Sequence, residues 1–194
     1  MDKPTKITIG SKQPSVNVNT VLNTPDKQRL DAKIVETLNN QIIIEFNTVN
    51  LFQSMYAYTE NAGMLNASKF FQQKVAEEQG HVNRVYKYML DKGILPVTPP
   101  VDKPTTIYKD LYTIIEACRL YQVGVTQSYE KLGTLALSIG DQTTYNFIQF
   151  FLNDQIQEEN TFITLCDQYK TLALGGMNGL SWIKLDKLFK QFTD

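Results

Sequence analysis

At 194 residues, the chain is within the range of a single domain and is long enough to bury a sizeable core. Hydrophobic residues make up 42% of the chain and charged residues 20%, which is typical of a globular protein and excludes a disordered or fibrous one. The formal net charge is −1, so no strongly basic balance indicates nucleic acid or anionic lipid as a partner.

The compartment follows from what the sequence lacks. The N-terminal segment has no basic start followed by an apolar run, and no stretch approaches the roughly 20 apolar residues of a membrane span. We therefore expect a cytoplasmic protein with no membrane partner. Cys118 and Cys166 lie in apolar helical patterns far apart in sequence, unlike the paired spacing of a disulfide scaffold or a zinc site. We interpret them as buried thiols.

Helical periodicity begins after a polar N-terminal segment. Residues 1–30 contain three prolines and many Asn, Thr and Lys residues, and they predict an extended arm rather than a domain. The remainder, 31–194, predicts four long helices and a short fifth one. The expected helices span about 31–61, 66–92, 107–138, 142–173 and 180–192.

The breaks between these helices define the topology. The first helix is expected to end at Gly63 and the second to begin at a possible cap, Asn66, and to end at Gly93, so these two helices form an antiparallel hairpin. Four prolines between 94 and 106 exclude a helix there and leave a connection long enough to run the length of a bundle. The sequence therefore predicts an all-α four-helix bundle with one long crossover.

The apolar seam of each helix, written at spacings of three and four residues, is interrupted by polar residues at one level. In the second helix these residues form a Glu-x-x-His pair one turn apart, so both side chains can reach one metal ion. The polar positions are Glu45 in the first helix, Glu78 and His81 in the second, Gln122 in the third, and Gln155 and Glu158 in the fourth.

Together these residues predict a metal site. Buried carboxylates are costly and repel one another unless they are protonated or share a cation. Three carboxylates, one imidazole and two amides form an oxygen-rich set without thiolate, which favours iron or manganese over structural zinc or copper. A hydrolytic triad is not indicated, since His81 is the only histidine and the layer has no Ser or Cys nucleophile.

Each residue taken alone has a simpler interpretation. A lone Glu45 is more often an exposed residue on a misphased helix, a lone His81 is more often simply hydrogen-bonded, and an isolated glutamine indicates little. Only the coincidence of four interrupted seams favours a metal. We interpret the nearby aromatic residues as core packing rather than redox relays; they are Phe52, Tyr56, Tyr88 and Tyr129.

Four segments resemble the non-haem bacterial ferritins, and the resemblance extends over residues 36–192. They are LNNQ at 38–41 leading to Glu45, AEEQGH at 76–81, DKGILP at 91–96, and YNFIQF at 145–150 running into Gln155 and Glu158. The ferritin-like bundle has the same single long crossover between its second and third helices. The resemblance implies an iron-storage subunit of a 24-subunit homo-oligomeric shell. Ferrous iron would be oxidised by dioxygen or peroxide at a di-iron centre, and the ferric product would be stored inside.

The resemblance also implies roles for individual residues. Glu45, Glu78 and His81 would hold a first iron, and Glu78 would bridge to a second iron held by Glu158 and assisted by Gln155. An outer third site would use Glu77, with Asp154 and Gln157 on the fourth helix.

Three positions depart from the family pattern. Gln122 replaces a glutamate of the second iron site, Gln157 removes a charge from the outer site, and Phe52 replaces a tyrosine next to the centre. We therefore expect iron binding, with weaker binding of the second iron and slower oxidation than in a ferritin with the full ligand set.

Other functions stay open at this stage. A cage-forming subunit with weak or lost ferroxidase activity would fit the depleted ligand set and could co-assemble with a more active subunit. A DNA-protecting mini-ferritin would place its ligands between subunits. A rubrerythrin-like peroxidase would repeat Glu-x-x-His in both halves of the bundle. The sequence indicates neither pattern, so both functions are less favoured. Spacing alone leaves a haem-binding bacterioferritin open, but no methionine falls at a convincing inter-subunit position, so we expect no haem.

The short fifth helix is amphipathic and allows two interpretations. Its apolar face and three lysines fit a helix on a membrane surface, whereas its position after Gly175-Gly176 resembles the ferritin helix that lines a channel at the four-fold axis. We favour the channel.

Overall fold

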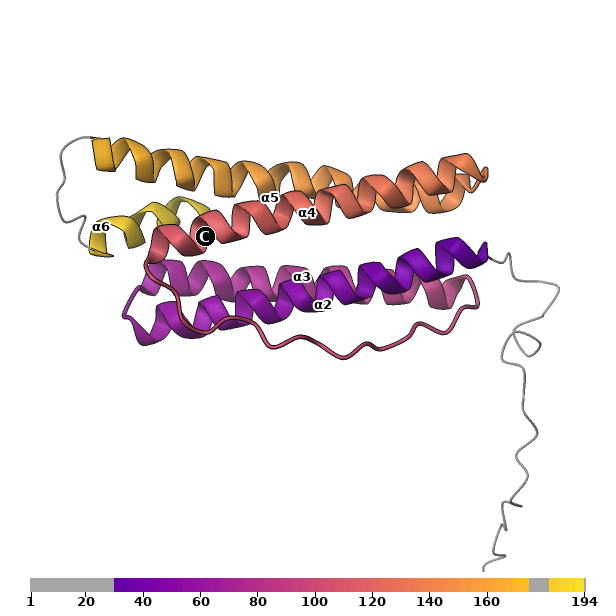
Figure 1. Cartoon of the computed structure of the whole chain (residues 1–194), viewed down its shortest axis with the longest axis horizontal. Helices are drawn as coiled ribbons and strands as arrows, with labels where there is room; N and C mark the ends of the chain where they lie inside the picture. The colour runs from indigo at the N-terminus through magenta and orange to yellow at the C-terminus, as the bar shows by residue number, and fades with distance from the viewer. Residues whose placement is uncertain (1–29, 175–181, 194) are drawn as a thin grey trace, which may run out of the picture.

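The computed structural model describes residues 30–174 and 182–193, which form a bundle of four long helices with a short helical segment against one end (Figure 1). This confirms the predicted all-α bundle. Most of the arm and the Gly175-Gly176 turn lie outside the described residues. The elements are α2 (Ala32–Asn61), α3 (Leu65–Asp91), α4 (Leu111–Ser138), α5 (Gln142–Leu174), α6 (Trp182–Asp186) and the 3-10 helix η1 (Lys187–Phe192).

Left-handed glycines follow three of the long helices. Gly63, Gly93 and Gly140 have φ values of 71°, 76° and 76°, a conformation that costs glycine little and other residues much more. Because two of these glycines stand in short turns, α3 folds back along α2 and α5 folds back along α4. Two antiparallel hairpins result, and Figure 1 shows them packed against each other.

The crossover between α3 and α4 is fastened to α2 by side chains of α2. Asn39 Oδ1 accepts a hydrogen bond from the Val97 backbone N–H at 2.9 Å, and Asn50 Nδ2 donates to the Asp102 carbonyl at 2.5 Å. Figure 1 shows the segment running beside the α2–α3 hairpin. These polar residues of α2 therefore satisfy backbone groups that an extended chain cannot satisfy by itself.

Two helix starts differ from those expected from the sequence. The third helix was placed at 107, but α4 begins at Leu111, where the Asp110 carboxylate accepts the Thr113 backbone N–H at 2.8 Å. Asn66 was wrong as the cap of the second helix, because α3 begins at Leu65 and Asp186 takes the capping role. The Asp186 carboxylate accepts the backbone N–H groups of Asn66 and Ala67 at 3.2 and 2.8 Å.

The C-terminal segment is not one continuous α-helix, as was expected for 180–192. Within the described residues it is the five-residue α6 followed by six residues of 3-10 helix, and it packs on the end of the bundle. Phe189 is fully buried against Phe70 and Phe71 of α3. The apolar face of the C-terminal segment therefore covers the end of the bundle in the same chain. None of the described helices is long and apolar enough to cross a membrane.

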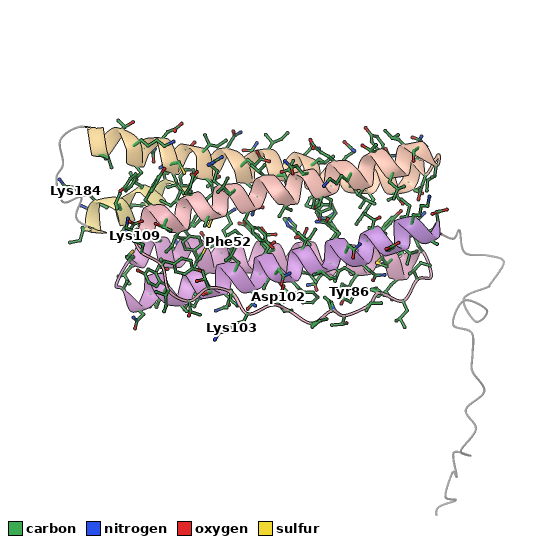
Figure 2. The ribbon with its side chains drawn as sticks, in the orientation of Figure 1. Phe52, Tyr86, Asp102, Lys103, Lys109 and Lys184 are labelled. Atoms are coloured by element: carbon green, nitrogen blue, oxygen red, sulfur yellow. The ribbon has the colours of Figure 1, made fainter. Side chains whose placement is uncertain are left out.

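Two apolar clusters fill the bundle, one toward each end. The cluster nearest α6 contains Phe52, which Figure 2 shows between the helices, together with Phe162 and Leu165. The other contains Leu38, Val125 and further residues near the opposite end. The polar layer predicted from the interrupted seams lies between these clusters. Cys118 and Cys166 are both buried and free.

We predict that Asp141, at the start of α5, contributes about 1 kcal/mol to stability. Its carboxylate accepts the Thr144 backbone N–H at 2.9 Å and the Thr143 hydroxyl at 2.9 Å. Calorimetry should show the thermal midpoint of Asp141→Ala lower by about 2–4 °C at neutral pH, with a smaller loss for Asp141→Asn, which keeps an acceptor. An unchanged midpoint for Asp141→Ala would contradict the capping role.

The pKa of the Asp141 carboxyl group predicts that its contribution to stability depends on pH. Partial burial would raise the pKa of Asp141, but the hydrogen bonds from Thr144 and Thr143 outweigh burial and the pKa is lowered. A lowered pKa in the folded state means that the charge stabilises the fold above the unfolded pKa and that this contribution is lost as pH falls. The difference between wild type and Asp141→Asn should therefore shrink below about pH 4.

Candidate metal centre

All four long helices contribute to the polar layer, and its side chains are almost completely shielded from solvent. Glu45 and Gln122 have no exposed surface, Glu78 and Gln155 are 1% exposed, and Glu158 is 5% exposed. His81 is 7% exposed. The structure therefore brings to one level every residue that the interrupted seams singled out.

Glu45, Glu78 and His81 form the tightest group in this layer. His81 Nδ1 lies 2.9 Å from Glu78 Oε2 and 3.7 Å from Glu45 Oε2. One ligand atom from each residue falls within 4.8 Å of the other two, and no other such trio of carboxylate, imidazole or thiolate groups occurs in the parts of the chain that the structure describes. Two carboxylates and an imidazole at this spacing can bind one divalent cation.

The second nitrogen of His81 is held by Asp154. His81 Nε2 lies 3.0 Å from Asp154 Oδ2, so Nε2–H donates to this carboxylate and Nδ1 is directed at Glu45 and Glu78. A carboxylate behind a histidine in this way fixes the ring and strengthens it as a metal ligand. The sequence placed Asp154 in an outer site with Glu77. In the structure Asp154 contacts His81, and the Glu77 carboxylate forms an ion pair with Lys74.

Glu45 is oriented by neutral donors on the side away from His81. Its Oε1 accepts hydrogen bonds from the Tyr129 hydroxyl at 2.5 Å and from Gln41 Nε2 at 2.8 Å. The Gln41 amide oxygen in turn accepts from the Ser128 hydroxyl at 2.7 Å. These contacts occupy one oxygen of Glu45 and leave Oε2 turned toward the centre.

The α4–α5 half of the layer is less charged. Gln122 Nε2 donates to Glu78 Oε1 at 3.1 Å, which leaves the Gln122 amide oxygen without a partner. Gln155 Oε1 accepts from Thr126 at 3.4 Å, and its nitrogen has no partner. Rotating this amide by half a turn exchanges its oxygen and nitrogen. Both glutamines can therefore present an amide oxygen to a cation.

Four buried polar atoms in the described residues lack a hydrogen-bond partner, and all four belong to this layer. They are Glu45 Oε2, Gln122 Oε1, Gln155 Nε2 and Glu158 Oε2. Leaving one such atom unsatisfied costs about 1–3 kcal/mol, and more when it is charged. Unpaired oxygens clustered in an otherwise apolar bundle indicate that a cation belongs among them.

Lys74 is a charged residue of the layer whose role sequence reasoning missed, as it missed the hydrogen bonds of Gln41 and Tyr129 to Glu45. The signal that could have found it is its spacing, because Lys74 stands four residues before Glu78 and lies one turn away on the same face of the helix. Its Nζ lies 2.5 Å from Glu158 Oε1 and 2.6 Å from Glu77 Oε2. The Lys74 side chain is 12% exposed and that of Glu158 is 6% exposed, so this ion pair is largely buried.

Burial and charge shift the protonation of these groups. Burial raises the pKa of Glu78 to about 7, against the hydrogen bond from His81. Burial alone would lower the pKa of His81, but hydrogen bonds to Asp154, Glu45 and Glu78 outweigh it and raise the pKa to about 12. The imidazolium therefore supplies part of the positive charge that the carboxylates need.

Lys74 supplies a second positive charge. Burial would lower the pKa of Lys74, but the carboxylates of Glu158 and Glu77 overcome this effect and raise it. Burial raises the pKa of Glu158, against the attraction of Lys74.

With the fold and this geometry in view, comparison with known proteins settles the family. Residues 35–172 match the ferritin-like domain. The chain belongs to the ferritin family. A probable bacterial non-haem ferritin-like protein of Haemophilus influenzae is 28% identical over 158 residues, covering 81% of this chain and 94% of that protein. A bacterial non-haem ferritin of Escherichia coli gives the same identity and coverage.

Solved ferritins have the same fold. An open-pore ferritin from the archaeon Archaeoglobus fulgidus superimposes with a TM-score of 0.77 at 25% identity, covering 84% of this chain and 98% of that one. A humanised archaeal ferritin gives a TM-score of 0.76, also at 25% identity. This ferritin is therefore of the non-haem bacterial type, and iron storage is the function of its family.

We predict that the Tyr129 hydroxyl stabilises the metal-free centre. Tyr129→Phe removes the donor 2.5 Å from Glu45 and leaves a buried carboxylate oxygen with one hydrogen bond, at a cost of about 1.5–3 kcal/mol. Calorimetry of the metal-free protein should show a clearly lower thermal midpoint. Tyr86→Phe is the matched control, because the Tyr86 hydroxyl bonds Thr98 at the surface. Equal midpoints for the two variants would contradict this role.

Proposed function

We propose that this ferritin binds ferrous iron in the polar layer, oxidises it there and stores the ferric product in a closed shell of identical subunits. The observation that carries the proposal is the Glu45, Glu78 and His81 group with unpaired carboxylate and amide oxygens around it. Iron is the cargo. Each Fe²⁺ gives up one electron, and dioxygen takes two of them with two protons to give hydrogen peroxide.

The residues of the group and those around it have different roles in binding iron. Glu45 and Glu78 supply charge, and His81 supplies a nitrogen ligand at Nδ1 once its proton leaves. Asp154 holds the imidazole in place from the other side. Neighbouring aromatic rings, such as Phe151 at 5.5 Å between centroids from His81, limit water around the centre.

Assembly into a shell is supported by apolar side chains on the surface of the single chain. Four of them lie in or beside the crossover and range from 42% to 85% exposed; they are Leu95, Val97, Val101 and Ile107. An extended segment that presents so many apolar groups fits a contact between subunits. We propose a homo-oligomer of 24 subunits, with co-assembly with a second ferritin subunit as a further arrangement.

A second function is favoured by Gln122 and Lys74. In this layer Gln122 is uncharged and the Lys74 ammonium pairs with Glu158. Such a layer fits a subunit that stores iron but oxidises it slowly and that assembles with a more active subunit. Oxidation of ferrous iron by the purified homo-oligomer alone separates these functions. Rapid oxidation would exclude the second one.

We predict that Glu78→Gln weakens binding of Fe²⁺ at least about tenfold. Glu78 contacts both His81 and Gln122, so the variant removes the charge shared by the two halves of the layer. Anaerobic titration calorimetry measures the effect. Glu130→Gln, which changes an exposed carboxylate on α4, is the matched control and should bind as wild type does. Wild-type affinity in Glu78→Gln would overturn the proposed site.

A further inference from the structure

We propose that the centre binds one ferrous ion rather than two, because the ammonium of Lys74 occupies the position on Glu158 that a second ion would take. This inference rests on the proposed function, since it specifies how the same layer holds its iron. It assigns to Lys74 the role of a built-in cation.

The position of Lys74 is fixed by three contacts. Its Nζ lies 2.5 Å from Glu158 Oε1 on α5, across the bundle, and 2.6 Å from Glu77 Oε2 on its own helix. It also lies 5.6 Å from the centroid of the Phe70 ring, within the range of a cation–π contact. Two carboxylates and an aromatic face hold the ammonium, so a second metal ion would have to displace a largely buried ion pair.

Charge balance in the layer separates one ion from two. Glu45, Glu78 and Glu158 carry three negative charges when ionised. One Fe²⁺ and the Lys74 ammonium together carry three positive charges, which balances them. Two Fe²⁺ and the ammonium would carry five. The carboxylates of Glu77 and Asp154, which contact Lys74 and His81, are 51% and 39% exposed and lie at the edge of the layer, and Gln122 offers no charge. Within the buried part of the layer, a second Fe²⁺ would therefore add charge that no further buried carboxylate offsets, which is unfavourable.

A single ion also explains why oxidation at this centre is expected to be slow. Reduction of dioxygen to hydrogen peroxide needs two electrons, and one Fe²⁺ supplies only one. Two ions bound side by side supply both electrons in one encounter, whereas a one-ion centre needs a second Fe²⁺ from solution or from another subunit. The sequence attributed slow oxidation to Gln122, Gln157 and Phe52, and the position of Lys74 adds a further obstacle.

Anaerobic soaking of crystals with Fe²⁺, followed by anomalous-difference maps at the iron edge, counts the ions directly. We expect one peak among Glu45, Glu78 and His81 in the wild type, and a second peak beside Glu158 in Lys74→Gln. Lys87→Gln is the matched control, because Lys87 pairs with Asp91 on the exposed face of the same helix, and it should show one peak. Lys74→Met removes the same charge with a different side chain, so a folding defect in one of the two variants does not decide the result.

The outcomes separate this inference from the proposed function. Two peaks in the wild type, or one peak in both Lys74 variants, would overturn the role of Lys74 while leaving iron binding in place. No peak near Glu78 in any protein would overturn the proposed function itself. Calorimetric titration of the wild type in solution should agree, with one strong Fe²⁺ site per subunit in the bundle.

Stopped-flow measurement of Fe²⁺ oxidation by dioxygen provides a second test of the role of Lys74. Gln122→Glu restores a carboxylate but leaves Lys74 on Glu158, so any gain in its initial rate should stay well below that of a variant that also removes Lys74. The double variant Lys74→Gln/Gln122→Glu should oxidise Fe²⁺ at least tenfold faster. A rate for Gln122→Glu alone that equals the double variant would overturn the inference and assign the limit to Gln122.

Discussion

Negative charge buried in the middle of an apolar bundle is the constraint on which the rest of this structure depends. Glu45, Glu78 and Glu158 are at most 5% exposed, and each lies on a different helix. Such charges are tolerated only with positive charge beside them. His81 and Lys74 provide it from α3. In the proposed function, iron binding would exchange the proton on His81 for a metal ion, so function and stability would depend on the same charges.

The surrounding fold keeps these charges aligned. Apolar clusters on both sides of the layer fix the helices at both ends, and the crossover is tied to α2 by asparagine side chains. Tyr129 and Gln41 then orient Glu45, and Asp154 orients His81. Because these supporting residues lie on helices, the carboxylates and the imidazole of the layer are held in a fixed arrangement.

Helical periodicity was sufficient to predict the helices and the polar layer, because an interrupted apolar seam marks a buried polar residue in a long helix. The four prolines between 94 and 106 predicted the crossover. Periodicity could not predict contacts between helices. Asp154 was expected in an outer site, and only the packing of α3 against α5 shows that it supports His81. Lys74 was unremarkable in sequence, since its role depends on Glu158, which is 84 residues away. Asp186 as the cap of α3 was missed for the same reason.

The central claim, that iron binds in this layer through His81, is tested most directly by X-ray absorption at the iron edge on protein given one Fe²⁺ per subunit without oxygen. The account predicts oxygen ligands with one imidazole, loss of the imidazole scattering in His81→Asn, and no iron–iron scattering at about 3.5–4 Å. A spectrum of oxygen ligands alone that His81→Asn leaves unchanged would contradict it.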